Sequence, residues 1–191
     1  MRNALFVAGM VAVLIGAAAA QVPKGNIYFG YTYYSTDLSL NRGGLNGFQA
    51  TLEGKLVPML GIVADFTGHY GSLNFPVFCS LCTSPTTASA NAHQYEVMFG
   101  PRVSFPVGKL RPFAEFDVGV GHVSTSGGAA ASNLLTGFLP DTSYATALGG
   151  GLDYKIFSHL AWRLEGDYVR THFFDAAQNN YRLSTGLAVH F

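Results

Sequence analysis

A histidine and a serine stand two residues apart, at His122 and Ser124, and such a pair could support nucleophilic chemistry. A serine hydroxyl becomes a nucleophile when a neighbouring base accepts its proton and a third group orients that base. The nearest later acid is Asp141, and a long segment rich in glycine and alanine separates it from the pair. We therefore favour a histidine at the end of a strand and a serine in a loop over a hydrolytic site, and we expect no enzymatic activity.

Cys79 and Cys82 form a Cys-x-x-Cys arrangement, which suits redox chemistry or one half of a zinc site. No second ligand pair lies nearby in the sequence, because His69 and His93 are isolated. On an oxidising cell exterior we expect a small structural disulfide, with free thiols as the alternative. The sequence therefore predicts no metal site, no catalytic site and no cofactor.

Charged residues recur on one parity of several segments that alternate apolar and polar side chains. Many carboxylates in one place could serve as an acid–base pair, line an ion path, or join the bases in an ion-pair network. The fourteen residues that share this parity are Glu53, Lys55, Asp65, Glu96, Arg102, Arg111, Glu115, Asp117, Asp153, Lys155, Arg163, Glu165, Asp167 and Arg182.

The alternating segments read as eight β-strands, separated by turn residues. Their predicted ranges are 26–35, 45–57, 60–70, 93–106, 110–123, 143–156, 160–173 and 180–191. The connections alternate between short ones of two or three residues and longer ones rich in small and polar residues. Outer-membrane barrels have short periplasmic turns and longer outer loops. The pattern therefore predicts an all-β fold, an eight-stranded antiparallel up-and-down transmembrane β-barrel.

The opposite parity of each predicted strand is apolar and is expected to face lipid. Arg170 is the one strand charge on this parity, at the outer end of its strand, where lipopolysaccharide phosphates could meet it. Aromatic residues gather at both strand ends, as the girdles of a membrane barrel do. The predicted girdles are Tyr33, Tyr70, Tyr95, Tyr144, Tyr168 and Tyr181 outside, and Phe105, Tyr154, Trp162 and Phe191 on the periplasmic side.

Eight strands enclose a lumen that inward side chains fill. Charges of both signs in so narrow a space must pair to offset their desolvation. We therefore predict an ion-pair network that plugs the barrel. The alternative is a narrow ion or small-solute channel between the same charges.

The N-terminus has the features of a cleaved secretory signal peptide, residues 1–20. A short positive start precedes an apolar run at 4–15, and small residues at 18–20 offer a cleavage site before Gln21. The barrel domain is then 21–191. Charged residues are 12% of the chain, against about 25% in soluble domains, and the net charge is zero. This composition favours lipid contact and predicts no nucleic-acid partner.

A signal peptide, eight amphipathic strands, unequal connections and a terminal Phe191 together resemble the small outer-membrane β-barrel family. This porin-type family includes the OmpA transmembrane domain and the OmpX-like barrels. The resemblance implies a monomer in the outer membrane of Gram-negative bacteria, in contact with lipid and lipopolysaccharide. It also implies that Phe191 is a signal for the outer-membrane assembly machinery. The implied role is structural or surface-interacting, serving envelope integrity or adhesion through the outer loops.

The tripeptide from His122 to Ser124 is also similar to the His-x-Ser pair of outer-membrane lipid A deacylases. That resemblance implies a lipid A-modifying hydrolase as a further alternative. The flanking Gly121 and Thr125 depart from the pattern of those enzymes, so the match is limited to two residues.

Overall fold

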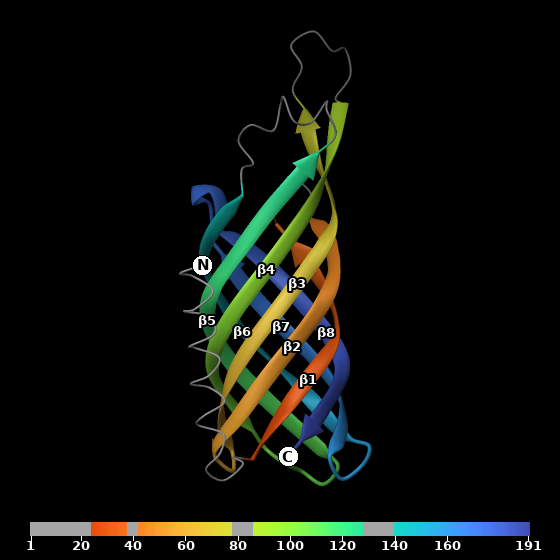
Figure 1. Cartoon of the computed structure of the whole chain (residues 1–191), viewed down its shortest axis with the longest axis vertical. Coiled ribbons are helices and arrows are strands. Elements are labelled where there is room, and N and C mark those ends of the chain that lie inside the picture. Colours follow the sequence, from red (N-terminus) through yellow and green to blue (C-terminus); the bar gives the residue numbers. More distant parts are fainter. Residues whose placement is uncertain (1–23, 38–41, 78–85, 128–139) are drawn as a thin grey trace, which may run out of the picture.

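The computed structural model describes residues 24–37, 42–77, 86–127 and 140–191. Eight antiparallel strands form one closed barrel, in which each strand pairs with the next and β8 pairs with β1 (Figure 1). The strands are β1 (Gly25–Thr36), β2 (Gly43–Val57), β3 (Leu60–Val77), β4 (Thr86–Ser104), β5 (Leu110–Gly127), β6 (Asp141–Lys155), β7 (Leu160–Thr171) and β8 (Gln178–His190). The predicted up-and-down barrel is confirmed. The predicted signal peptide and the two cysteines lie outside the described residues.

Side chains alternate strictly between the inside and the outside of the barrel. Tyr28 is fully buried, whereas its neighbour Phe29 is 63% exposed. A β-strand points successive side chains to opposite faces, so one parity fills the lumen and the other covers the outer wall. The outer wall carries a belt of exposed apolar side chains: Ile27, Phe29, Leu52, Ile62, Phe66, Phe99, Phe116, Val118, Leu148, Leu164, Leu183 and Leu187. Such a belt in contact with water would be strongly unfavourable, and it suits a lipid environment.

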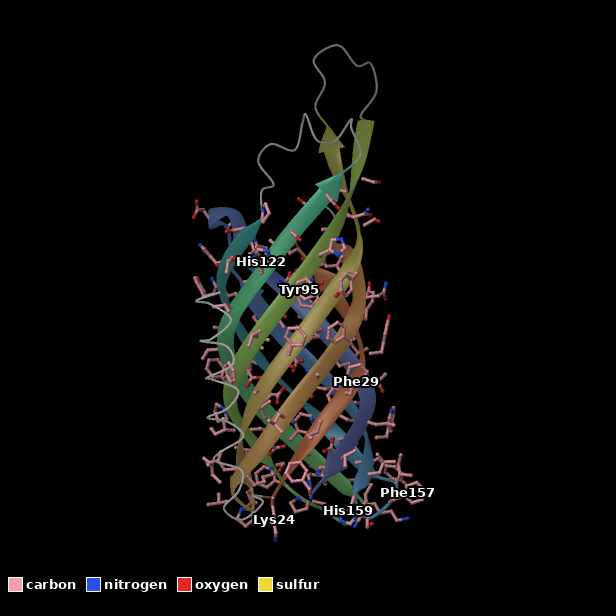
Figure 2. The ribbon with its side chains drawn as sticks, viewed as in Figure 1. Lys24, Phe29, Tyr95, His122, Phe157 and His159 are labelled. Atoms are coloured by element: carbon pink, nitrogen blue, oxygen red, sulfur yellow. The ribbon has the colours of Figure 1, made fainter. Side chains whose placement is uncertain are left out.

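The two ends of the barrel differ in their connections. Three tight turns gather at one end, called here the turn end, together with Lys24 and Phe191 (Figures 1 and 2). The turn between β4 and β5 closes with two backbone hydrogen bonds between Val107 and Leu110, at 2.7 and 3.0 Å. Gly108 has a φ of +63° there, a conformation that glycine adopts without strain. The opposite end is called the loop end.

The β3–β4 hairpin is longer than the sequence pattern predicts. Pairing continues to Val77 opposite Thr86, whereas residues 71–92 were expected to form a loop. Cross-strand contacts support the extension, because the Ser72 hydroxyl donates to the Asn91 side chain at 2.9 Å. The β4 half of the extension, residues 86–92, consists only of small and polar residues, so no large apolar side chain marks a strand there. The hairpin rises beyond the neighbouring strands at the loop end (Figure 1).

The chain between β7 and β8 folds back over the lumen. Strand β7 ends at Thr171, two residues earlier than predicted, and a 3-10 helix (η2, Phe173–Asp175) follows. The Phe173 amide donates to Gln178 Oε1, and Gln178 Nε2 donates to the Phe173 carbonyl, each at 2.8 Å. These two bonds fix Phe173 in a fully buried position. No helix among the described residues is long and apolar enough to cross a membrane.

Candidate functional site

Two arginines form the ionic layer nearest the turn end of the lumen. Arg163 bonds Asp153 at 2.6 and 2.9 Å, and Arg102 Nε bonds Glu115 at 2.5 Å. Phe113 lies between the two arginines, with guanidinium carbons 4.4 Å (Arg102) and 4.7 Å (Arg163) from its ring centroid. The aromatic faces and the carboxylates together replace the water that the guanidinium groups lose on burial.

Glu165 lies at the centre of the network and approaches three arginines. Its carboxylate is 3.5 Å from Arg102 and 3.9 Å from both Arg163 and Arg182. The side-chain amide of Gln49 donates to it at 2.7 Å. One carboxylate therefore links guanidinium groups that β4, β7 and β8 carry, and the network crosses the lumen rather than following its wall.

Arg182 forms the next layer toward the loop end. Its guanidinium contacts Asp65 and Asp167, each at 2.7 Å, and these acids come from β3 and β7. The side chain is fully buried. Because Arg182 joins opposite walls of the barrel, the mid-lumen is bridged by ion pairs.

A glycine allows two carboxylates of this network to approach each other. Gly149 pairs with Glu115 on one side and with Asp167 on the other, so no side chain separates the two acids. Ligand atoms of Glu115, Glu165 and Asp167 lie within 4.8 Å of one another, the spacing of a metal site. Arg102 bonds Glu115 and Arg182 bonds Asp167, so these two carboxylates already have arginine partners.

Acids outnumber bases in the buried lumen. Three buried arginines and Lys55 face eight buried carboxylates. Asp117 is fully buried, and neither of its oxygens has a hydrogen-bond partner among the described residues. In the part of the chain that the structure describes, the hydrogen-bond partners of Glu96 are all neutral: Tyr34, Gln94 and Thr67. The pairing of charges in the lumen is therefore incomplete.

The fourteen residues of the predicted network do not all lie at the same depth. Eleven are buried: Glu53, Asp65, Glu96, Arg102, Glu115, Asp117, Asp153, Arg163, Glu165, Asp167 and Arg182. Lys55 pairs with Glu53 and donates to the Ser104 hydroxyl at 2.6 Å. Arg111 is half-buried and contacts His190, whereas Lys155 is exposed at the turn end. The last two residues therefore line the mouth of the barrel rather than its interior.

Sequence reasoning missed an apolar cluster that fills the lumen toward the loop end. Its buried members are Tyr34, Leu45, Leu73, Ala90, Ala92, Met98, Ala145, Ala147 and Val169. The ring of Phe173 closes over Gly121, where a β-carbon would lie 2.9 Å from it. The signal was present, because these residues share the inward parity of the charges. A polar lumen was expected throughout, so they received no role.

The predicted outer girdle lies toward the loop end, and its residues are exposed except for the half-buried Tyr95. The hydroxyls of Tyr70 and Tyr95 are 2.8 Å apart, and the rings of Tyr168 and Tyr181 pack with centroids 5.7 Å apart. Arg170 is exposed on the outer wall, as the parity predicted. The periplasmic set of Phe105, Tyr154, Trp162 and Phe191 is exposed toward the turn end.

The structure does not bring together the three residues of the hydrolase alternative. His122 is exposed on the outer wall, and its Nδ1 lies 2.7 Å from the Thr142 hydroxyl. Among the described residues, no hydrogen bond joins His122 to Ser124. Asp141 is registered opposite Val123, whose side chain is fully buried. Cross-strand partners share a face of the sheet, so Asp141 lies on the face opposite to His122.

Solved structures with this architecture are known. Neisserial surface protein A superposes with a TM-score of 0.63 at 12% identity, over 87% of this chain and 97% of that one. OprG from Pseudomonas aeruginosa gives 0.56 at 13% identity, over 88% and 96%. Ail, the attachment invasion locus protein of Yersinia pestis, gives 0.54 at 13% identity, over 87% and 99%. No protein-family model and no curated protein matches the sequence.

These likenesses, at such low identity, establish the fold. The chain has the fold of the small eight-stranded outer-membrane β-barrels, as its resemblance to the OmpA and OmpX type predicted. Its exposed apolar belt and its aromatic girdles fit the same setting. It is an integral β-barrel of the bacterial outer membrane.

Proposed function

We propose that this protein is a closed structural barrel whose loop end presents a surface for binding partners outside the cell. The observation that carries the proposal is the filling of the lumen. Ion pairs around Glu165 bridge the middle, and the apolar cluster around Tyr34 and Leu45 fills the loop end. Opening a path would separate buried ion pairs and expose apolar surface, both at a high cost in free energy.

The β3–β4 hairpin supports the second half of the proposal. It extends the barrel wall beyond the other strands, so a partner approaching from outside meets it first (Figure 1). Its backbone is paired with β4 from Tyr70 to Val77. The attachment invasion locus protein, a structural neighbour, was crystallised with a heparin analogue, and binding at the loop end is the corresponding role proposed for this chain.

No catalytic role is part of the proposal. The outward position of His122 and the opposite face of Asp141 support this. We further propose that the barrel acts as a monomer, that Arg170 meets lipopolysaccharide phosphates, and that Phe191 serves recognition by the assembly machinery. The Phe191 backbone pairs with Gly25 at 2.9 and 3.0 Å, so the last strand is closed on the first up to this residue.

Three measurements test the proposal. Purified protein in a planar bilayer should show no long-lived, uniform conductance steps; such steps would replace the closed barrel with the channel alternative. A variant that joins Gly71 to Ala92 through an Asn-Gly turn should still fold, as heat-dependent gel mobility reports, yet lose binding of cells to a surface or host matrix. Retained binding would contradict a role for the hairpin.

Unchanged lipid A mass after Ser124→Ala is expected, and a change would restore the hydrolase alternative.

A further inference from the structure

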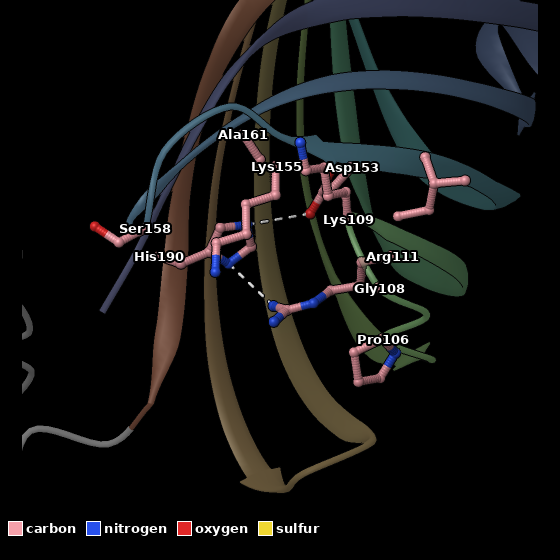
Figure 3. Close-up of a pocket in the computed structure, with 10 residues that line it drawn as sticks. Pro106, Gly108, Lys109, Arg111, Asp153, Lys155, Ser158, Ala161 and His190 are labelled. Atoms are coloured by element: carbon pink, nitrogen blue, oxygen red, sulfur yellow. Dashed lines mark hydrogen bonds and ion pairs between the residues drawn. The ribbon is translucent and has the colours of Figure 1, made fainter.

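The turn end of the lumen holds a cationic vestibule that none of the functions above uses. Two cavities of about 230 and 440 Å³ open there and share Pro106, Arg111 and His190 as lining residues (Figure 3). The basic side chains that line them are Lys24, Lys55, Lys109, Arg111, Lys155 and His190. Asp153 is their one acidic lining side chain, and Arg163 bonds both of its oxygens.

Arg111 lies opposite Asp153 in the strand register, but among the described residues it forms no ion pair with a carboxylate. Its Nη1 lies 3.1 Å from His190 Nδ1, and a guanidinium group only donates hydrogen bonds. His190 therefore accepts at Nδ1 and carries its proton on Nε2, which lies 3.4 Å from Asp153 Oδ2. These two contacts, the dashed lines of Figure 3, orient the guanidinium group through His190 rather than by a direct ion pair with Asp153.

Backbone pairing holds lysines together at the same mouth. The Lys155 amide donates to the Lys109 carbonyl, and the Lys55 amide donates to the Lys24 carbonyl, each at 2.8 Å. Among the described residues, the ammonium groups of Lys24, Lys109 and Lys155 make no ion pair. Like charges on adjacent strands repel, so the three unpaired ammonium groups favour a bound anion at this mouth.

The vestibule is closed toward the loop end, because the ion pairs of Arg163 and Arg102 lie between it and the rest of the lumen. An anion that entered would be retained at the mouth and would not pass through. We propose that the vestibule is a binding site for a phosphate-type oxyanion on the periplasmic side of the membrane. The guanidinium fork of Arg111 would bind two oxygens, and Lys155 and Lys109 would supply point charges. The phosphate would come from an anionic phospholipid headgroup in the periplasmic leaflet of the outer membrane, or from a soluble periplasmic compound.

The test follows the imidazole and guanidinium NMR signals of His190 and Arg111 in full-length mature protein held in lipid nanodiscs. In zwitterionic lipid, inorganic phosphate at constant ionic strength should shift these signals saturably. Arg111→Gln and Lys155→Gln should each weaken binding about ten-fold, because each removes a charge-assisted contact. In the Arg111→Gln variant, the His190 signal alone is followed. Arg170→Gln is the matched control, since it removes one positive charge from the outer wall and should leave the affinity unchanged.

A second arm separates the two sources of phosphate. Nanodiscs that contain phosphatidylglycerol, without added phosphate, should shift His190 if the headgroup is the ligand, and inorganic phosphate should then compete. A shift with free phosphate alone assigns the site to a soluble compound. Absence of a shift in both arms overturns the proposal. An equal loss in Arg170→Gln also overturns it, as does unchanged affinity in both vestibule variants.

Discussion

Arg163 and Asp153 meet as a two-point ion pair inside the barrel, with Nε to Oδ1 at 2.6 Å and Nη2 to Oδ2 at 2.9 Å. Both residues are buried, and the Arg163 guanidinium carbon also lies 5.0 Å from the Tyr28 ring centroid. A buried pair with this geometry contributes little compared with an apolar pair of equal volume, yet leaving one partner alone is costly. Its effect on stability therefore depends on whether both partners are removed.

Replacing one partner should cost more than replacing both. We expect Asp153→Leu or Arg163→Met alone to lower the free energy of unfolding by about 3–5 kcal/mol, because each leaves an uncompensated buried charge. The double variant should recover much of that loss. Urea unfolding in lipid vesicles measures all four proteins as a double-mutant cycle. Additive effects of the two substitutions would show that the pair is not coupled.

Asp117→Asn should leave the barrel as stable as the wild type or make it more stable. Asp117 is buried without hydrogen-bond partners among the described residues, in a lumen where carboxylates exceed cations. An amide of the same shape removes a buried charge that forms no ion pair among the described residues. Asp153→Asn is the matched control and should lose about 1.5–3 kcal/mol, because its bonds to Arg163 are charge-assisted. The same unfolding assay applies, and a large loss for Asp117→Asn would reveal a partner for this carboxylate.

The sequence predicted the barrel and the two faces of its wall, because period-two alternation is a local property. Glu165 and Leu164 are adjacent, and their opposite burial follows directly from parity. The depth of a residue along the barrel axis, in contrast, is not a local property of the sequence. Arg182 and Lys155 share the inward parity, yet the first is fully buried and the second is exposed. Their difference depends on the stagger between strands, which the sequence pattern alone does not give.

Partner choice within the lumen was also beyond sequence reasoning. The sequence predicted that opposite charges pair in the lumen. It did not predict that Arg182 joins Asp65 to Asp167, or that Phe113 lies between two arginines. The contacts of Arg182 with Asp65 and of Arg163 with Phe113 join strands that are not consecutive in the chain. Only the closed register brings them together.

Gly149→Ala should destabilise the barrel, whereas Gly54→Ala should not. A β-carbon at Gly149 would lie 1.8 Å from Asp167 Oδ1 and 2.7 Å from the Gly166 carbonyl oxygen, but one at Gly54 would meet nothing within 4 Å. Asp167 would have to leave its position beside Arg182, which we expect to cost about 1–3 kcal/mol. Gly54→Ala should stay within about 0.5 kcal/mol of the wild type. Equal stability of the two variants, measured by urea unfolding, would mean that Asp167 moves without loss of its ion pair.

Leu164→Arg should prevent assembly or lower stability by about 2–4 kcal/mol, because this exposed side chain lies in the apolar belt between the two aromatic girdles. Leu56→Arg places the same side chain near the turn end, where the long arginine reaches the interface and the cost falls to about 0–1 kcal/mol. The pair separates a depth effect from any general intolerance of arginine on the outer wall.

Natural Arg170 supports this expectation, since it is tolerated on the same wall toward the loop end of β7. Folding into vesicles, followed by heat-dependent gel mobility and urea titration, measures both variants. A soluble barrel would accept arginine equally well at Leu164 and at Leu56, because both side chains would face water. Equal tolerance would therefore contradict the lipid-facing assignment of the belt, and with it the orientation on which the cationic vestibule and the outward hairpin depend.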